Sequence, residues 1–430
     1  MNFLNYLYFF IITGLGVKFL FQSKGLIKNP LHRRQYMVLT GPEMFLILTF
    51  STGLLAFSSS AGSFDLMAIR LLALEIMCLI GLSKSEHKPV WSLSVWAYLF
   101  YLIWLTIGLS YTPSIFYGFR VILKYLYPFL IMLLASAVVR DKEVFLTAGL
   151  GAQIVALISI IFSFVPFIGA LVPGVFWYVT AEAIHYISMA MFSLALFYYG
   201  GKNKRYLMFS GLFMLPCFLW VFRTSMMGTA LALAAFFFFR YKLKSLPYIA
   251  GVALLLIGIV FTVPNVKKKM FFKEEEKDIA QLQTGEITRG DIKDNGRFAM
   301  WDDLMERFYH NKEIVGSGTG STQNYFYSNF VFGGLKVAHS DYIQMLCDTG
   351  LIGLVLYLLA AFLAIVHSFF EFNKKDASIP VKMCAIVAGS SLAGLLLTMY
   401  SDNDVNYSMA TLSYPFGFYG MMLGLIKGKK

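Results

Sequence analysis

The stretch HSDYIQMLCDTGLIGLVLYLLAAFLAIVH, residues 339–367, joins a long polar segment to one of the most apolar runs of the chain. About 20 apolar residues are enough for a helix to cross a bilayer. Such runs recur along almost all of the 430 residues, of which 58% are apolar and only 14% charged. Soluble domains carry roughly 25% charged residues. The pattern therefore predicts a polytopic membrane protein.

The apolar runs predict an all-α membrane bundle of 12 or 13 spans, in three parts. Residues 1–263 are expected to hold ten helices, residues 264–340 one long extracytoplasmic loop, and residues 341–430 three more helices. The expected helices cover residues 3–22, 37–58, 64–83, 89–109, 118–139, 144–165, 183–199, 206–222, 226–240, 247–263, 341–369, 380–400 and 406–426. The first run lacks the features of a cleaved signal, so we expect it to stay as a helix. The four cysteines lie in apolar runs, which predicts no disulfide.

Basic residues set the expected orientation. They concentrate in alternate connections, around Lys28, Lys88, Arg140, Lys204, Arg240, Lys375 and Lys429. Short cytoplasmic loops retain such residues. The C-terminus is therefore expected in the cytoplasm, and with thirteen spans the N-terminus outside. The net charge of +12 is mainly this topology signal and does not indicate a nucleic-acid partner.

The polar segment 264–340 lies outside by the same alternation, and long loops are exempt from the charge rule. Within it, NGRFAMWDDLMERFYH (residues 295–310) places apolar side chains at helical spacing, with charges opposite. The apolar positions are Phe298, Trp301, Met305 and Phe308. This pattern predicts an amphipathic helix that lies on the outer membrane surface.

Several cations are expected on the outer side of the bundle. Arg120 and Lys124 share one helix face, Arg223 stands at a hairpin, and Arg297 begins the amphipathic helix. Ionisable groups inside a bilayer are costly, which makes them functional candidates. Snorkelling to the interface explains any one of these cations. For the set, a bound anion is the better explanation, and the planar fork of arginine suits a phosphate.

The opening stretch places a histidine at the mouth of a helix. A helix that begins near His339 would carry one stripe of residues four and three apart, namely His339, Ile343, Leu346, Gly350 and Gly353. Ser340 or Asp341 would cap it, and the glycines would let a neighbouring helix approach. The imidazole then faces the bundle and can accept a proton near neutral pH. The alternative is a structural histidine bonded to loop carbonyls.

These residues carry a family resemblance. His339-Ser340, followed after nine residues by Gly350-Leu351-Ile352-Gly353, resembles the signature of the O-antigen ligase and polymerase superfamily. Further matching features are Asp348, Gly296-Arg297, Trp301, and the glycines Gly316, Gly318 and Gly320. FRTSMMGTALAL resembles the Ser-Arg-Thr helix start of the family, although Phe222 replaces its serine, and YGFRVILKYL resembles its arginine-bearing helix. Residues 177–188 lack the Asn-Pro-Asn-like element of the family.

The resemblance implies a glycosyltransferase of the bacterial cytoplasmic (inner) membrane whose active site is on the outer, periplasmic face. Its donor would be a glycan on undecaprenyl diphosphate, and its acceptor a sugar or lipid-linked glycan. His339 would be the catalytic base. The donor diphosphate would bind Arg120, Arg223, Arg297 and, as a weaker candidate, Lys124. Candidates for acceptor contact or support of the site are Asp348, Glu182, His185 and Trp301.

Other partners implied are membrane lipid and a chain-length regulator. No cofactor and no metal ion are expected. Asp402 and Asp404 form an outward acid pair that a divalent cation could bind, but a solvated loop is the simpler interpretation. GSGTGS lacks the Gly-Lys-Ser/Thr ending of a Walker loop.

Four functions remain open on these residues, and one of them is that of a non-catalytic assembly partner. A polymerase joins repeat units that both sit on polyprenyl diphosphate, and a ligase moves the finished chain to the core of lipid A. We favour the polymerase because such enzymes are the more numerous and varied in the family. The alternative from another class is a transporter of lipid-linked sugars. Transporters often show two related halves with charges near the midplane, and neither feature is visible here.

Overall fold

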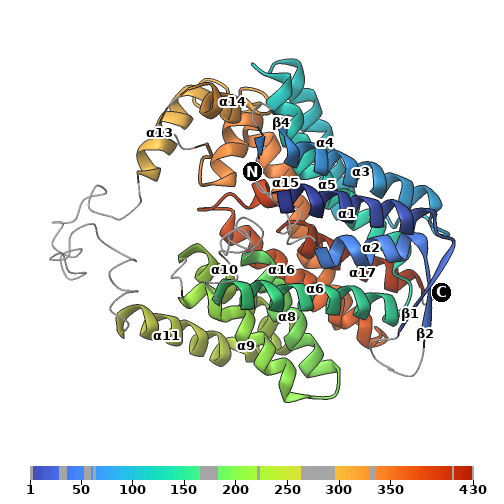
Figure 1. Cartoon of the computed structure of the whole chain (residues 1–430). Helices are drawn as coiled ribbons and strands as arrows, with labels where there is room; N and C mark the ends of the chain where they lie inside the picture. Colours follow the sequence, from blue (N-terminus) through green and yellow to red (C-terminus); the bar gives the residue numbers. More distant parts are fainter. Residues whose placement is uncertain are drawn as a thin grey trace.

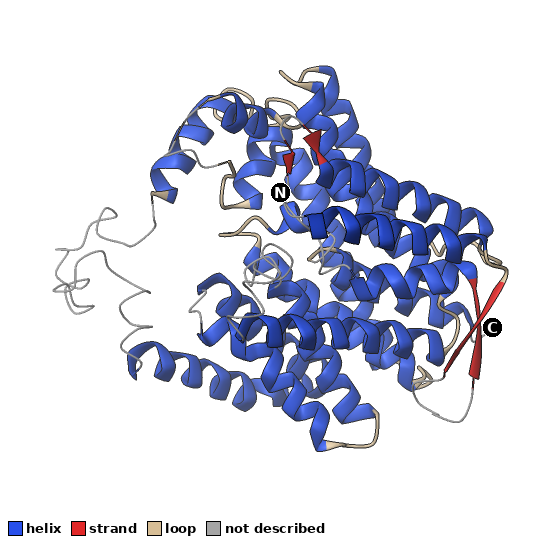
Figure 2. Ribbon diagram, viewed as in Figure 1, coloured by secondary structure: helices blue, strands red, loops and turns tan. Residues whose placement is uncertain are grey.

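The computed structural model describes residues 3–28, 36–52, 60–61, 64–164, 183–219, 223–262, 296–329, 331, 336–408 and 411–428. Within these ranges the chain is a bundle of helices with two short strand pairs (Figures 1 and 2). The predicted all-α polytopic membrane bundle is confirmed.

Each expected span overlaps one helix, although the last helix begins at Ser413 and not at residue 406 as expected. In chain order these are α1 (Phe3–Phe21), α2 (Gly41–Thr52), α3 (Leu66–Lys84), α4 (Leu93–Ile107), α5 (Ile115–Val138), α6 (Lys142–Phe164), α8 (Ala183–Tyr199), α9 (Lys204–Leu219), α10 (Arg223–Tyr241), α11 (Leu246–Thr262), α15 (Asp341–Asn373), α16 (Ile379–Thr398) and α17 (Ser413–Gly428). By length and hydropathy, six helical stretches in the described ranges could each cross a membrane; they begin at Leu93, Ile115, Lys142, Arg223, Asp341 and Ile379. The full number of crossings stays a prediction.

The first expected boundary inside the bundle is wrong. A helix was expected from residue 37, but β1 (Lys24–Lys28) pairs antiparallel with β2 (Tyr36–Thr40), and α2 begins only at Gly41. The sequence of β2, YMVLT, is rich in residues that favour strands. Pro42 fits the first turn of a helix, where its missing N–H is not needed. A second, two-residue pair joins β3 (Ser60–Ala61) and β4 (Phe64–Asp65).

Contacts between distant residues show which helix ends lie together. The Arg140 guanidinium donates to the carbonyl oxygens of Lys88 and Gly424, 3.2 Å each. The Lys84 ammonium donates to the carbonyl of Leu20. The ends of α1, α3, α5 and α17 and the basic residues beside them therefore lie together, and we name this the basic end. Figure 1 shows the C-terminus beside β1 and β2, and the start of α1 near the middle of the view. That the basic end faces the cytoplasm stays a prediction.

Two shorter helices precede α15, namely α13 (Arg297–Phe308) and α14 (Ser321–Ser328). The predicted amphipathic helix is thus present as α13. Its apolar side joins a small core made by Met300, Trp301, Leu304, Phe326, Ala338 and Cys347. We expected this side to lie on the membrane surface. The structure covers it with α14 and the start of α15 instead, because these elements offer it enough apolar area.

A break in α15 fixes the loop between α13 and α14. Gly350 has φ 64°, a conformation that costs little only for glycine. The backbone N–H groups of Leu351 and Ile352 donate to the carbonyls of Glu313 and Ile314. A Cβ on Gly350 would come within 2.3 Å of the Ile314 oxygen. This glycine therefore allows close approach of a loop, whereas we expected a neighbouring helix.

Candidate active site

His339 lies just outside the helix that it was expected to begin. Ser340 is the cap of α15, since its side chain accepts from the N–H of Ile343 at 3.3 Å, and the helix begins at Asp341. His339 itself has φ 52°. Histidine is enriched in this left-handed region, but a residue held there still costs of order 1–3 kcal/mol and often marks a functional site. The predicted stripe is therefore wrong at its first position.

The imidazole of His339 is half-buried and has a defined partner. Its Nδ1 lies 3.1 Å from the side-chain nitrogen of Asn403. Burial, aided by the positive charge of Arg297, lowers the pKa of His339 to about 4. The ring is therefore neutral at pH 7 and can accept a proton. Because Asn403 occupies Nδ1, Nε2 is the ring nitrogen left for a substrate.

Asn403 belongs to the turn between α16 and α17, residues 399–408, which we name the 399–408 turn. The N–H of Asp341 donates to the carbonyls of Met399 and Asp402, and a carboxylate oxygen of Asp341 accepts from the N–H of Val405 at 3.2 Å. The start of α15 is thus bonded to the turn on both sides of Asn403. These bonds hold the amide of Asn403 next to the imidazole.

The same turn holds the helices that carry two candidate arginines. The carbonyl oxygen of Ser401 accepts a hydrogen bond from Nη1 of Arg297 at 2.7 Å. The hydroxyl oxygen of Ser401 lies 2.6 Å from the hydroxyl oxygen of Thr224. Thr224 follows Arg223, the first residue of α10. Ser401 thereby brings the start of α10 and the start of α13 together.

Lys124 meets the other end of the turn, where it is buried and donates to the side-chain oxygen of Asn406. Arg120 lies one helical turn away on α5, with its guanidinium carbon 5.3 Å from the ring centre of Tyr327 and 5.6 Å from that of Tyr117. From Ser401 to Asn406 the backbone spans at most about 18 Å. One short turn therefore contacts α5, α10, α13, His339 and the start of α15.

The Asp402–Asp404 pair is not the solvated pair that we expected. Asp404 is only 2% exposed, and its side chain accepts from Thr398 while its carbonyl accepts from Thr411. Burial raises the pKa of Asp404 well above its usual range, and the nearby charge of Asp402 adds to this. Burial also raises the pKa of Asp402, against the lowering effect of the Asn403 N–H and Arg297. Within the described ranges, no three His, Cys, Asp or Glu side chains group as metal ligands.

Asp348 ties the glycine-rich loop to α15. One carboxylate oxygen accepts from the N–H and the hydroxyl of Thr322, both at 2.9 Å, and the other from the N–H of Gly320 at 3.0 Å. Gly320 has φ 84°, and a Cβ there would meet the backbone of Gly118 at 2.5 Å. The contacts of Asp348 are thus those of a residue that supports the site.

Trp301 supports the histidine from the other side. Its indole N–H donates to the carbonyl of Ala338 at 2.7 Å, and its ring centre lies 6.0 Å from that of Tyr400. Trp301 thus holds the residue directly before His339. Trp301 and Asp348 both contact the backbone that carries the site.

Two candidates remain. Glu182 is outside the described residues. His185 lies in α8, fully buried, with Nε2 3.1 Å from the carbonyl of Ala152 and its ring stacked 4.0 Å from that of Tyr414. These neighbours belong to α6 and α17. Such packing is that of a core residue, and an acceptor contact by His185 stays a prediction.

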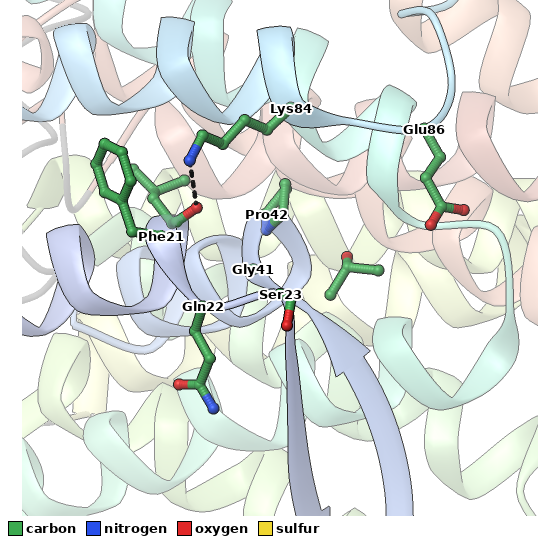
Figure 3. A pocket seen from close by; sticks show the side chains of 9 residues that line it. Phe21, Gln22, Ser23, Gly41, Pro42, Lys84 and Glu86 are labelled. Carbon is green, nitrogen blue, oxygen red and sulfur yellow. Dashed lines mark hydrogen bonds between the residues drawn. The ribbon is translucent and has the colours of Figure 1, made fainter.

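A cleft of about 290 Å³ lies at the basic end, between α1, α2 and α3 (Figure 3). Lys84 lies across it, with its ammonium 3.6 Å from the ring centre of Phe21. None of the candidate site residues lines this cleft. It is therefore separate from the cluster around His339.

Residues 217–358 match the family model described as O-antigen ligase. This match confirms the resemblance to the O-antigen ligase and polymerase superfamily. It spans Arg223, Arg297 and His339, whereas Arg120, Lys124 and the 399–408 turn lie outside it. A search of curated proteins finds no match.

The sequence prediction missed Ser401 and Asn403. A short polar turn between two apolar runs resembles any solvated loop. The sequence carries no signal that singles out either residue, since Ser and Asn are common in turns for their bonds to the local backbone.

Proposed function

We propose that the protein is an integral-membrane glycosyltransferase that moves a glycan from polyprenyl (undecaprenyl) diphosphate to the hydroxyl of an acceptor sugar. We further propose that it polymerises the repeat units of a surface polysaccharide, on the side of the membrane opposite the basic end. The family match supports the reaction class. The observation that carries the proposal is the 399–408 turn, which joins His339 to the helix starts that carry Arg223 and Arg297.

The proposed chemistry uses His339 as general base. The acceptor hydroxyl gives its proton to Nε2 while its oxygen bonds the anomeric carbon of the donor sugar. The bond from that carbon to the diphosphate oxygen breaks, and its electron pair leaves with polyprenyl diphosphate. The imidazolium then releases the proton to water. A positioned base of this kind contributes roughly 10²–10⁴-fold.

The arginines would stabilise the leaving diphosphate, on which negative charge grows as the bond breaks. Arg297 is suited to this because the Ser401 carbonyl already fixes one of its five donors. Arg223 begins α10, so the positive end of the helix dipole adds to its charge. Arg120 and Lys124 would meet the diphosphate from α5. The donor arrives activated, so no nucleotide is required.

A ligase is the second candidate, favoured by the description of the matching family model. The two functions differ in the acceptor, which is a second lipid-linked repeat unit for the polymerase and the lipid A core for the ligase. They share the donor and the proposed roles of His339 and the arginines.

The test uses the full-length protein in lipid vesicles. With the lipid-linked repeat unit alone, we expect a ladder of longer glycans, and the His339→Ala variant should give none. Product only when lipid A core is added would replace the polymerase by the ligase. Full activity of folded His339→Ala would remove the proposed base. We expect transfer to survive EDTA, and strict dependence on an added divalent cation would contradict the metal-independent mechanism.

A further inference from the structure

The amide of Asn403 stands at a point where it can decide which nitrogen of His339 carries the proton. Its side chain is only 5% exposed, and its nitrogen lies 3.1 Å from Nδ1 of the imidazole. Its oxygen is buried and has no hydrogen-bond partner among the described residues. A half-turn of the planar amide exchanges the two atoms in place. Each orientation makes one bond to the ring.

The two orientations select opposite tautomers. An amide nitrogen at Nδ1 needs a lone pair there, which puts the proton of the neutral ring on Nε2. An amide oxygen at Nδ1 needs an N–H there, which leaves the lone pair on Nε2. Only the second state, which is opposite to the amide orientation in the structure, has a proton acceptor directed away from Asn403.

We infer that Asn403 is a positioning residue whose side-chain oxygen holds the Nδ1–H tautomer of His339 during transfer, so that Nε2 is the base. This inference rests on the proposed function. The bonds of Asp341 to the residues on either side of Asn403 restrict its backbone. An asparagine held in this way has few side-chain rotamers, so its amide fixes the plane of the imidazole as well as its tautomer.

The charges that face this pair come from three elements. Arg297 of α13 is the charge that acts on His339 itself, whereas Asp341 of α15 and Asp402 and Asp404 of the turn act on one another. Because an amide has no charge, it orients the ring without favouring the imidazolium. A carboxylate in its place would favour the imidazolium. This difference gives a readout that a purely structural role would not produce.

The kinetic test compares Asn403→Ala and Asn403→Asp with Ser408→Ala. Ser408 lies in the same turn, and its buried hydroxyl has no hydrogen-bond partner among the described residues, so its variant should keep full activity. Asn403→Ala should lower kcat roughly 10- to 100-fold with little change in the KM of the donor. Asn403→Asp should retain activity. Because a carboxylate favours the imidazolium, the acid limb of the pH profile, where kcat/KM falls at low pH, should move to higher pH. An unchanged limb for folded Asn403→Asp would overturn the inference.

A direct measurement does not depend on either variant. The wild-type protein labelled with ¹⁵N in its imidazoles reports the protonated nitrogen of each neutral ring, and His339→Gln identifies the signals of residue 339. In the presence of the donor we expect Nδ1 to be protonated and Nε2 unprotonated. The reverse assignment would overturn the inference and leave the proposed reaction class standing. Failure of the proposed function itself would appear separately, as the absence of glycan transfer by the wild-type protein.

Discussion

The two ends of α15 each carry a histidine, and their surroundings differ. At the first end, His339 lies outside the helix in a left-handed conformation, with Asn403 and Arg297 as neighbours. At the other end, His367 lies within the helix, with Nδ1 2.8 Å from the hydroxyl of Tyr419 and Nε2 3.4 Å from a carboxylate oxygen of Glu371.

The comparison separates two uses of an imidazole. His367 has both nitrogens taken by protein groups, which joins α15 to α17 and leaves neither nitrogen for a substrate. His339 has one ring nitrogen bonded to a protein group, and its backbone is held in a strained, left-handed conformation. Burial and the positive charge of Arg297 keep its ring neutral. The difference indicates that partner count and backbone conformation, more than burial, distinguish a candidate base from a structural histidine.

The largest expected effect comes from removing the imidazole at the first end. His339→Ala should lower the transfer rate by at least roughly 10²–10⁴-fold and leave membrane insertion intact, with a small loss in melting temperature, because alanine keeps the positive φ of residue 339 and loses the hydrogen bond to Asn403. The rate of glycan transfer in vesicles measures the first, and thermal unfolding the second. Equal losses in His339→Ala and His367→Ala would remove the distinction between the two ends.

Next in size is the link between α15 and the glycine-rich loop. Asp348→Ala leaves the donors of Thr322 and Gly320 without their buried acceptor, and we expect a loss of about 3 kcal/mol in stability. Asp348→Asn keeps one acceptor oxygen and should lose less. Melting temperatures of the two variants measure the difference. Equal melting temperatures would show that these bonds do not stabilise the first end.

A third test concerns the charge beside His339. The base must be unprotonated, and burial with the Arg297 charge sets its pKa at about 4. The kcat/KM of the wild type should therefore be level near neutral pH and fall as the pH drops through about 4. Arg297→Gln removes the repelling charge, so protonation becomes easier and the acid limb moves to higher pH. Arg307→Gln, on the same helix but paired with Asp303, is the matched control. A limb that stays at the wild-type pH in Arg297→Gln would contradict this account.

The smallest effect is expected at the other end of α15. His367→Gln weakens a partly exposed pair with Glu371, and such pairs contribute roughly 0–1 kcal/mol. Transfer should stay within about threefold of the wild type. The transfer rate and the melting temperature of this variant, measured beside those of His339→Ala, test the two expectations. A loss of transfer rate comparable to that of His339→Ala would show that His367 matters for catalysis, contrary to this comparison.

The helices could be predicted from the sequence because a lipid-facing helix must be apolar along its whole length. The cap Ser340 and the helix α13 followed from local patterns. The short strand pair before α2 did not, since an apolar run can be strand or helix at its edge. The break at Gly350 also stayed hidden, because it serves a contact with residues 313 and 314 that only the fold creates.

The candidate site shows the same limit. His339, Arg223 and Arg297 could be selected from residue type and family resemblance. That they share one turn could not be predicted, since Ser401 and Asn403 act through hydrogen bonds between segments far apart in sequence. The burial of Asp404 likewise depends on Thr398 and on the packing of two helix ends, and no composition rule reports it.

The 399–408 turn also decides where a reporter can be attached. One inserted residue adds up to about 3.5 Å of chain. This is enough to break the hydrogen bonds of the turn to several helices at once, and we expect the protein to lose activity although the helices stay folded. By contrast, Gly201 lies in an exposed hairpin with open space around it. A fluorescent or protease tag for mapping sidedness therefore belongs at Gly201, where a change in signal would report on topology and not on damage.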